Sequence, residues 1–213
     1  MVVIVLLIVV GSVILHELAH GAVAYFLGDR TAKDAGRLTL NPLKHIDPYM
    51  SIIVPVILYL LNAPVFGGAK PVPIDSRNLK WREWGLALVA IAGPLTNFLI
   101  AFIAFLIGHF AGLLGVASGS LYYLSDSLPA FIVAETVVIN LGFMIFNLIP
   151  IPPLDGSRVL YALAPDAIRE YMRRLEPYGF IIVYALILIF GQLFSNLMFN
   201  GIDGMLNFFQ FLV

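Results

Sequence analysis

The sequence contains no cysteine, and only 12% of its 213 residues are charged. Without cysteine the chain can form no disulfide, hold no metal through thiolates and use no cysteine nucleophile. Hydrophobic residues make up 61% of the chain, a composition far from that of a soluble domain. The net charge is −1, and no basic helix or aromatic platform favours nucleic-acid binding. We therefore expect a polytopic membrane protein whose surroundings are the lipid bilayer.

Long apolar runs divide the chain into segments. They occupy residues 1–27, 49–66, 86–116, 128–156 and 179–200. A helix needs about 20 residues to cross a hydrocarbon core of about 30 Å. Four runs reach that length, whereas the run 49–66 is short and contains Pro55 and Pro64. This pattern predicts an all-α polytopic membrane protein with about four transmembrane helices, a re-entrant segment and short irregular or β loops. The last transmembrane helix is expected at 179–200.

The distribution of basic residues predicts the topology. All twelve lie in three connecting segments: Arg30, Lys33, Arg37 and Lys44; Lys70, Arg77, Lys80 and Arg82; and Arg158, Arg169, Arg173 and Arg174. The connection 117–130 has none, and lysine and arginine accumulate on the cytoplasmic side. If the run 49–66 enters the bilayer and returns, all three basic segments face the cytoplasm. We therefore expect one membrane-embedded domain over 1–213 in the cell (plasma) membrane, with its N-terminus and the segment 117–130 outside.

A short polar motif, His16-Glu17-Leu-Ala-His20, interrupts the first apolar run. Ionisable side chains at bilayer depth are costly and are usually functional. On a helix the two histidines lie one turn apart on one face and can bind one Zn²⁺, with Glu17 placed to take a proton from water. The alternative is that they hydrogen-bond neighbouring helices. The metal interpretation predicts a zinc hydrolase that cuts peptide bonds inside the membrane, reached by a polar channel from the cytoplasm.

A catalytic zinc site usually has three protein ligands, so a third must be sought. His45 lies in the loop after the first span, and His109 lies far along the third apolar run. Asp155 is the better candidate, because it ends the motif Asn-Leu-Ile-Pro-Ile-Pro-Pro-Leu-Asp-Gly at 147–156. Its prolines break a helix, and irregular backbone at membrane depth indicates a lined cavity. In the alternative, Asp155 caps a helix that begins near Ser157. Spacing alone leaves both open.

These motifs together resemble the site-2 protease family of intramembrane zinc metalloproteases, peptidase family M50. Besides the two motifs above, similar signatures occur at 41–48 (Asn-Pro-Leu-Lys-His-Ile-Asp-Pro), 68–73 (Gly-Ala-Lys-Pro-Val-Pro) and 93–97 (Gly-Pro-Leu-Thr-Asn). The resemblance extends from residue 11 to about 164. It is closest in kind to the small, core-only members, which lack a soluble peptide-binding domain and a nucleotide-sensing domain.

The resemblance implies one Zn²⁺ per chain, bound by His16, His20 and Asp155. It also implies that Glu17 is the catalytic base and that Asn97 lies near the substrate or the tetrahedral intermediate. Alternatively, Asn97 is a polar joint between helices beside a small contact at Gly93. The substrate implied is another membrane protein with a transmembrane segment.

The segment 67–77 is a candidate substrate-binding element. Lys70, Pro71 and Val72 favour an extended backbone, which could pair with an unwound substrate as an added strand. The alternative is a surface loop tied to the re-entrant segment. For the protein as a whole, a divalent-metal transporter would need more ligands along a path. A catalytically silent scaffold would be expected to lack Glu17 or a ligand. The sequence predicts no oligomeric state.

Overall fold

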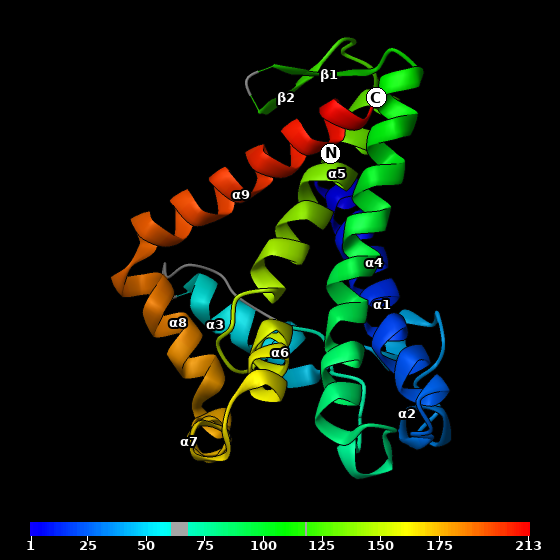
Figure 1. Cartoon of the computed structure of the whole chain (residues 1–213). Coiled ribbons are helices and arrows are strands. Elements are labelled where there is room, and N and C mark those ends of the chain that lie inside the picture. The colour runs from blue at the N-terminus through cyan, green and yellow to red at the C-terminus, as the bar shows by residue number, and fades with distance from the viewer. Residues whose placement is uncertain (61–67, 118) are drawn as a thin grey trace.

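The computed structural model describes residues 1–60, 68–117 and 119–213, and this part of the chain is mostly helical (Figure 1). The α-helices are α1 (Val2–Phe26), α2 (Thr31–Asp34), α3 (Val54–Leu60), α4 (Arg82–Phe110), α5 (Leu128–Asn147), α6 (Asp155–Leu163), α7 (Asp166–Leu175), α8 (Gly179–Ile189) and α9 (Gly191–Leu212). Two strands, β1 (Leu114–Ala117) and β2 (Ser120–Tyr123), form a small antiparallel hairpin. The predicted fold class is confirmed.

Three long helices form the centre of the molecule. Helices α1, α4 and α5 have 25, 29 and 20 residues, and each is long and apolar enough to cross a membrane. Helix α4 packs against both α1 and α5. Its buried positions are mostly small, including Ala87, Ala90, Gly93, Ala101 and Ala104. Small residues let neighbouring helix backbones approach closely, which is how helices associate where apolar burial gives no preference over lipid.

The run 179–200 is not one helix, which corrects the expectation of a single C-terminal span. The helical stretch Asp166–Ile189, which ends with α8, meets α9 at Phe190 with a bend of 95°. The reason lies in packing. Leu206 and Phe209 of α9 are buried in a core cluster with Phe105 of α4 and Leu141 of α5. The bend lets α9 turn back across the bundle to reach this core, as Figure 1 shows. The two bent helices add a fourth candidate span only if both are counted as one broken span.

The apolar run 49–66 contains a π-helix at Pro48–Ile53 followed by α3. With 7 residues, α3 is about 10 Å long and cannot cross the bilayer by itself. The second half of the run, residues 61–67, lies outside the described residues. The re-entrant path of this segment therefore stays a prediction.

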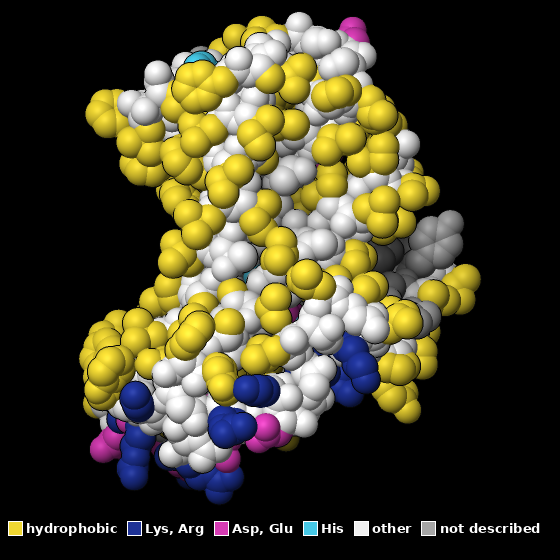
Figure 2. All heavy atoms as spheres, turned by 90° about the vertical axis from the view of Figure 1, so that its right-hand side faces the viewer, with side chains coloured by type: hydrophobic (Ala, Val, Ile, Leu, Met, Phe, Trp, Pro, Cys, Tyr) yellow, Lys and Arg dark blue, Asp and Glu magenta, His cyan; other side chains and the backbone are white. Residues whose placement is uncertain are grey.

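Charged side chains separate from apolar ones along the molecule. On the face shown in Figure 2, lysine, arginine and most acidic side chains gather at the end that contains α2, α7 and the start of α4, while apolar side chains cover the rest. The β hairpin lies at the opposite end, beside the N-terminus and the end of α9. This segregation, together with the candidate spans, defines an integral membrane protein.

Candidate zinc site

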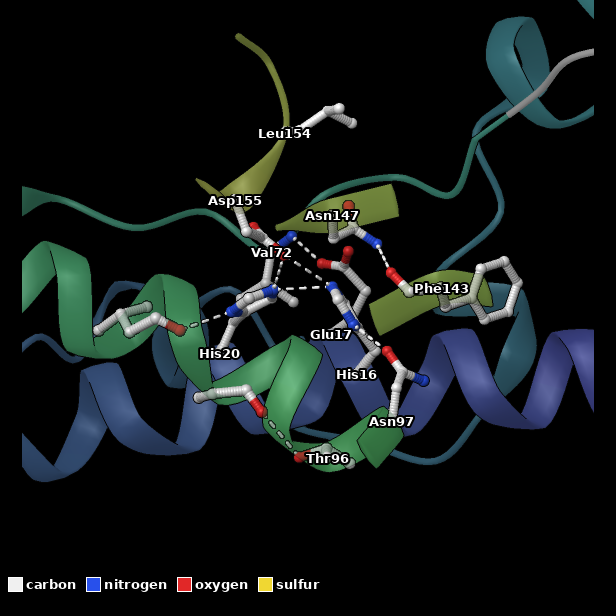
Figure 3. Close-up of polar contacts among 12 residues, drawn as sticks. His16, Glu17, His20, Val72, Thr96, Asn97, Phe143, Asn147, Leu154 and Asp155 are labelled. Carbon is white, nitrogen blue, oxygen red and sulfur yellow. Dashed lines mark hydrogen bonds and ion pairs between the residues drawn. The ribbon is translucent and has the colours of Figure 1, made fainter. Parts of the chain in front are cut away.

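The structure brings His16, His20 and Asp155 together at the centre of the bundle (Figure 3). The two histidines lie one turn apart on α1, and Asp155 begins α6. The Nε2 atoms of the two histidines are 2.9 Å apart. The Oδ2 atom of Asp155 lies 3.1 Å from Nε2 of His16 and 3.3 Å from Nε2 of His20. Three atoms of the types that bind zinc therefore converge on one point.

The hydrogen bonds made by the Nδ1 atoms of the two histidines indicate that their Nε2 atoms are available to bind a metal ion. The Nδ1–H of His20 donates to the carbonyl oxygen of Val89 at 2.7 Å, and the Nδ1–H of His16 donates to Oδ1 of Asn97 at 2.6 Å. Both Nε2 atoms then carry lone pairs that face Oδ2 of Asp155, which is buried and has no hydrogen-bond partner. Three acceptor atoms at these distances repel one another unless a cation lies between them. The donor set of two imidazoles and one carboxylate fits Zn²⁺ with an open position for water.

Gly93 makes room for the Nε2 atoms of the two histidines. A Cβ at this position of α4 would lie 2.4 Å from Nε2 of His20 and 2.6 Å from Nε2 of His16. Such distances are too short for any side chain, so only glycine leaves the two Nε2 atoms free. The motif Gly-Pro-Leu-Thr-Asn thus contributes to the site from both of its ends, since Asn97 supports His16 from behind.

The position of Asp155 follows from the irregular segment before it. Residues 148–154 leave the helical path of α5, and the α6 helix starts at Asp155 with Leu154 as its N-cap and no side-chain cap hydrogen bond. The alternative in which Asp155 caps this helix is therefore wrong. The next residue must be small, because a Cβ at Gly156 would lie 2.2 Å from the carbonyl oxygen of Leu148.

The other two histidines lie elsewhere. His45 is buried and donates from Nε2 to the carbonyl oxygen of Thr39. His109 stacks on Phe105 near the end of α4. Neither belongs to the cluster of possible metal ligands among the described residues.

Glu17 lies beside this cluster without joining it. Its Oε2 atom accepts a hydrogen bond of 2.8 Å from the backbone N–H of Val72 (Figure 3). Glu17 and the three metal-binding candidates line one cavity of about 730 Å³. The cavity walls come from α1, the segment 68–76, α4, α5, α6 and α8. The volume is large enough for many water molecules and for an extended peptide segment.

Asn97 and Asn147 lie differently with respect to the cavity. Asn97 is fully buried behind His16 and does not line the cavity, so its position favours an action through the histidine ring over direct contact with a substrate. Asn147 does line the cavity, and its Nδ2–H donates to the carbonyl oxygen of Phe143. Asn147 begins the motif at 147–156, but the sequence pattern assigns it no role. The sequence feature that could have pointed to Asn147 is its position in the same motif, eight residues before Asp155.

Within the candidate substrate-binding residues, the cavity is lined by Pro71 and Val72, whereas Lys70 is exposed. The backbone of Lys70 is fixed on both sides. Its N–H donates to the carbonyl oxygen of His45, and its carbonyl oxygen accepts from the guanidinium of Arg37. The segment is thus tied to the loop after α1.

Asp29 is a residue that sequence reasoning missed. It is fully buried and accepts hydrogen bonds from the backbone N–H and hydroxyl of Thr31, the backbone N–H of Asp75 and Nδ2 of Asn78. Burial alone would raise the pKa of Asp29, but these hydrogen bonds outweigh it and hold the pKa below the ordinary value of 3.8. The carboxylate therefore joins the end of α1 to the segment that contacts Glu17.

Comparison with known proteins agrees with this geometry. The model of "Peptidase family M50" matches residues 4–130 and 109–190. The chain is 41% identical to the "Putative zinc metalloprotease YwhC" of Bacillus subtilis (strain 168), over 82% of this chain and 75% of the relative. The chain is also 33% identical to the "Putative zinc metalloprotease Rip2" of Mycolicibacterium smegmatis, over 83% of this chain and 63% of the relative.

A solved structure, the site-2 protease from Methanocaldococcus jannaschii, matches 96% of this chain and 74% of that chain at 22% identity, with a TM-score of 0.46. The spans and the motifs define the class as a membrane zinc metalloprotease. The chain belongs to peptidase family M50, the site-2 protease family.

Proposed function

We propose that this protein is an intramembrane endopeptidase that hydrolyses peptide bonds within or near transmembrane segments of other membrane proteins. The observation that carries the proposal is that His16, His20, Asp155 and Glu17 line one cavity between helices long enough to cross the bilayer. A hydrolytic site at this depth can reach a peptide bond that soluble proteases cannot.

In this proposal His16, His20 and Asp155 hold one zinc ion per chain. When bound, zinc acts as a Lewis acid that makes a bound water more acidic and polarises the scissile carbonyl. Glu17 accepts the proton of the attacking water and returns it to the leaving amine, a contribution of about 10²–10⁴-fold in rate. The N–H of Val72 holds the Glu17 carboxylate in place through its 2.8 Å hydrogen bond.

Water and substrate must both reach this site. We infer that the cavity opens toward the cytoplasm, because the segment 68–76 that forms one of its walls continues into the basic connection with Arg77 and Lys80. The same positive-inside distribution supports an orientation with the hairpin outside. The membrane we propose is the cell (plasma) membrane.

The substrate must unwind before cleavage, since an intact helix uses its carbonyl groups in hydrogen bonds to residues four positions on. The segment from Lys70 to Pro73 could then receive it as an added strand. The N–H groups of Lys70 and Val72 are already engaged, and Pro71 and Pro73 have none. An unwound substrate would therefore be held here by donating its own N–H groups to carbonyl oxygens of this segment.

The substitution Glu17→Gln tests the proposal, because it keeps the size of the side chain and removes the base. We expect the variant to retain zinc while cleavage of a membrane-embedded substrate falls about 10²–10⁴-fold, and uncut substrate to copurify with it. Metal analysis and substrate length on gels give the two readouts. A transporter would instead show altered metal flux, and a scaffold would leave substrate length the same in wild type and variant. Unimpaired cleavage by the glutamine variant would exclude the assigned mechanism.

A further inference from the structure

Behind the metal-binding candidates lies a chain of buried amides that the proposed mechanism does not use. Asn97 of α4 donates from Nδ2 to Oδ1 of Asn140 in α5 at 2.8 Å. The Nδ2 group of Asn140 then donates to the backbone carbonyl of Thr136 at 2.8 Å and to the hydroxyl of Ser12 in α1 at 2.9 Å. Asn97 and Asn140 are both fully buried. Buried amides at membrane depth are costly unless every group is paired, and these are.

The backbone carbonyl of Thr136 fixes which group donates and which accepts in this series of hydrogen bonds. A backbone carbonyl can only accept, so the group of Asn140 that faces Thr136 must be the NH₂ group. Oδ1 of Asn140 must then face Asn97, and Asn97 must present its own NH₂ group to it. The remaining oxygen of Asn97 faces His16 and can only accept from Nδ1–H. The hydroxyl of Ser12 can donate or accept, so it sets no direction.

The two histidines therefore receive their orientation in different ways. The Nδ1–H of His20 donates to the backbone carbonyl of Val89. This single main-chain contact keeps the proton on Nδ1 and leaves Nε2 free to bind the metal. His16 faces a side-chain amide, which could rotate by 180° and present NH₂ instead of oxygen. In the rotated state Nδ1 of His16 would lose its acceptor. The orientation of Asn97 matters for this reason, and Asn140 is the residue that determines it.

We propose that Asn140 is a positioning residue of the zinc site, which acts through Asn97 to commit Nε2 of His16 to the metal. The proposal rests on the proposed zinc site and extends it to a residue of α5 that neither lines the cavity nor contacts a ligand atom. Asn97 hydrogen-bonds a proposed metal ligand directly, and loss of such a partner typically changes metal affinity by about 10- to 100-fold. Asn140 lies one hydrogen bond further away, so its effect should fall at the lower end of this range.

Three variants separate this role from a general effect on packing. Asn140→Leu has a similar size and removes the acceptor that orients Asn97. Asn140→Asp is expected to be the neutral acid in this fully buried place. Its O–H can then donate to the Thr136 carbonyl while its other oxygen faces Asn97, so it should keep the orientation. Ser12→Ala is the matched control, because it removes one hydrogen bond from the same amide and leaves the Thr136 contact intact.

Zinc affinity of the purified full-length chain, measured by competition with a chelator, is the first readout. We expect a loss of about tenfold for Asn140→Leu and changes within about threefold for Asn140→Asp and Ser12→Ala. The second readout is the ring Nδ1–H of each histidine in zinc-loaded, ¹⁵N-histidine-labelled protein, which is tractable because the chain has only 4 histidines. The Nδ1–H of His16 should shift and exchange faster in Asn140→Leu, while that of His20 stays unchanged.

The outcomes are distinct. If Asn140→Leu matches Ser12→Ala in both readouts, the positioning role is overturned. If the leucine variant does not fold, Asn140→Asp decides, and a tenfold loss of affinity in that variant overturns the proposal. If zinc binds wild type and His16→Ala equally well, the proposed zinc site itself fails, which is a different result from failure of the positioning role.

Discussion

Gly93 shows how much one residue without a side chain decides at this site. The Cβ of an alanine would lie 2.4 Å and 2.6 Å from the Nε2 atoms of His20 and His16. Zinc–nitrogen bonds are about 2.0–2.1 Å long, so the methyl group would occupy the place of the metal or displace both rings. We predict that Gly93→Ala lowers zinc affinity by about tenfold or more, as measured by chelator competition, and abolishes proteolysis.

The control for this prediction is Gly142→Ala, on the neighbouring helix α5. A Cβ at Gly142 meets nothing within 4 Å, and alanine is a better helix former than glycine. This variant should bind zinc as wild type does. Full zinc occupancy in Gly93→Ala would show that the metal lies away from α4.

Among the elements, α9 is the helix whose course depends most on tertiary contacts. Its residue Phe209 is fully buried, and its ring centroid lies 4.9–5.4 Å from those of Phe98, Phe102 and Phe105 in α4. We predict that Phe209→Ala destabilises the protein by about 3–5 kcal/mol, because it leaves a cavity in this cluster. Equilibrium unfolding in detergent gives the measurement.

A phenylalanine two positions further along α9 gives the matched control. Phe211 is 86% exposed, so Phe211→Ala should change stability by less than about 0.5 kcal/mol. Equal effects of the two substitutions would show that α9 does not dock on α4 in the membrane and that the bend at Phe190 is not held by this core.

For the whole molecule, the placement of charge predicts one orientation in the bilayer. The chain has no cysteine, so each introduced cysteine is the only reactive thiol. We predict that a membrane-impermeant thiol reagent added to intact cells labels Ser120→Cys in the hairpin and does not label Ala35→Cys or Ala167→Cys. All three positions are exposed, and the latter two lie near the basic segments.

Permeabilised cells provide the control, since all three thiols should then react. Labelling of Ala35→Cys in intact cells would place the loop after α1 outside. The proposed cytoplasmic opening of the cavity would then be wrong, although the zinc chemistry would be unaffected.

The local patterns determined much of what this protein is. Apolar runs of sufficient length predicted α1, α4 and α5, because a helix that satisfies its own backbone is the only open-ended element that lipid tolerates. The spacing of His16 and His20 placed both rings on one helix face, and the family resemblance gave Glu17 and Asp155 their roles. Those predictions needed only short-range geometry or a sequence motif.

Only the tertiary structure decided how distant segments meet. Asp155 lies 135 positions after His20, and its convergence on the histidines depends on the path of residues 148–154. The contacts of Asp29 with Asp75, of Asn140 with Ser12 and of Gly93 with the two histidines join segments far apart in the sequence, so no local pattern predicts them. The bend at Phe190 likewise has its cause in a core on α4 and α5. Sequence periodicity reports which residues avoid water or enter lipid, whereas the pairing of faces and the direction of buried hydrogen bonds depend on the packed whole.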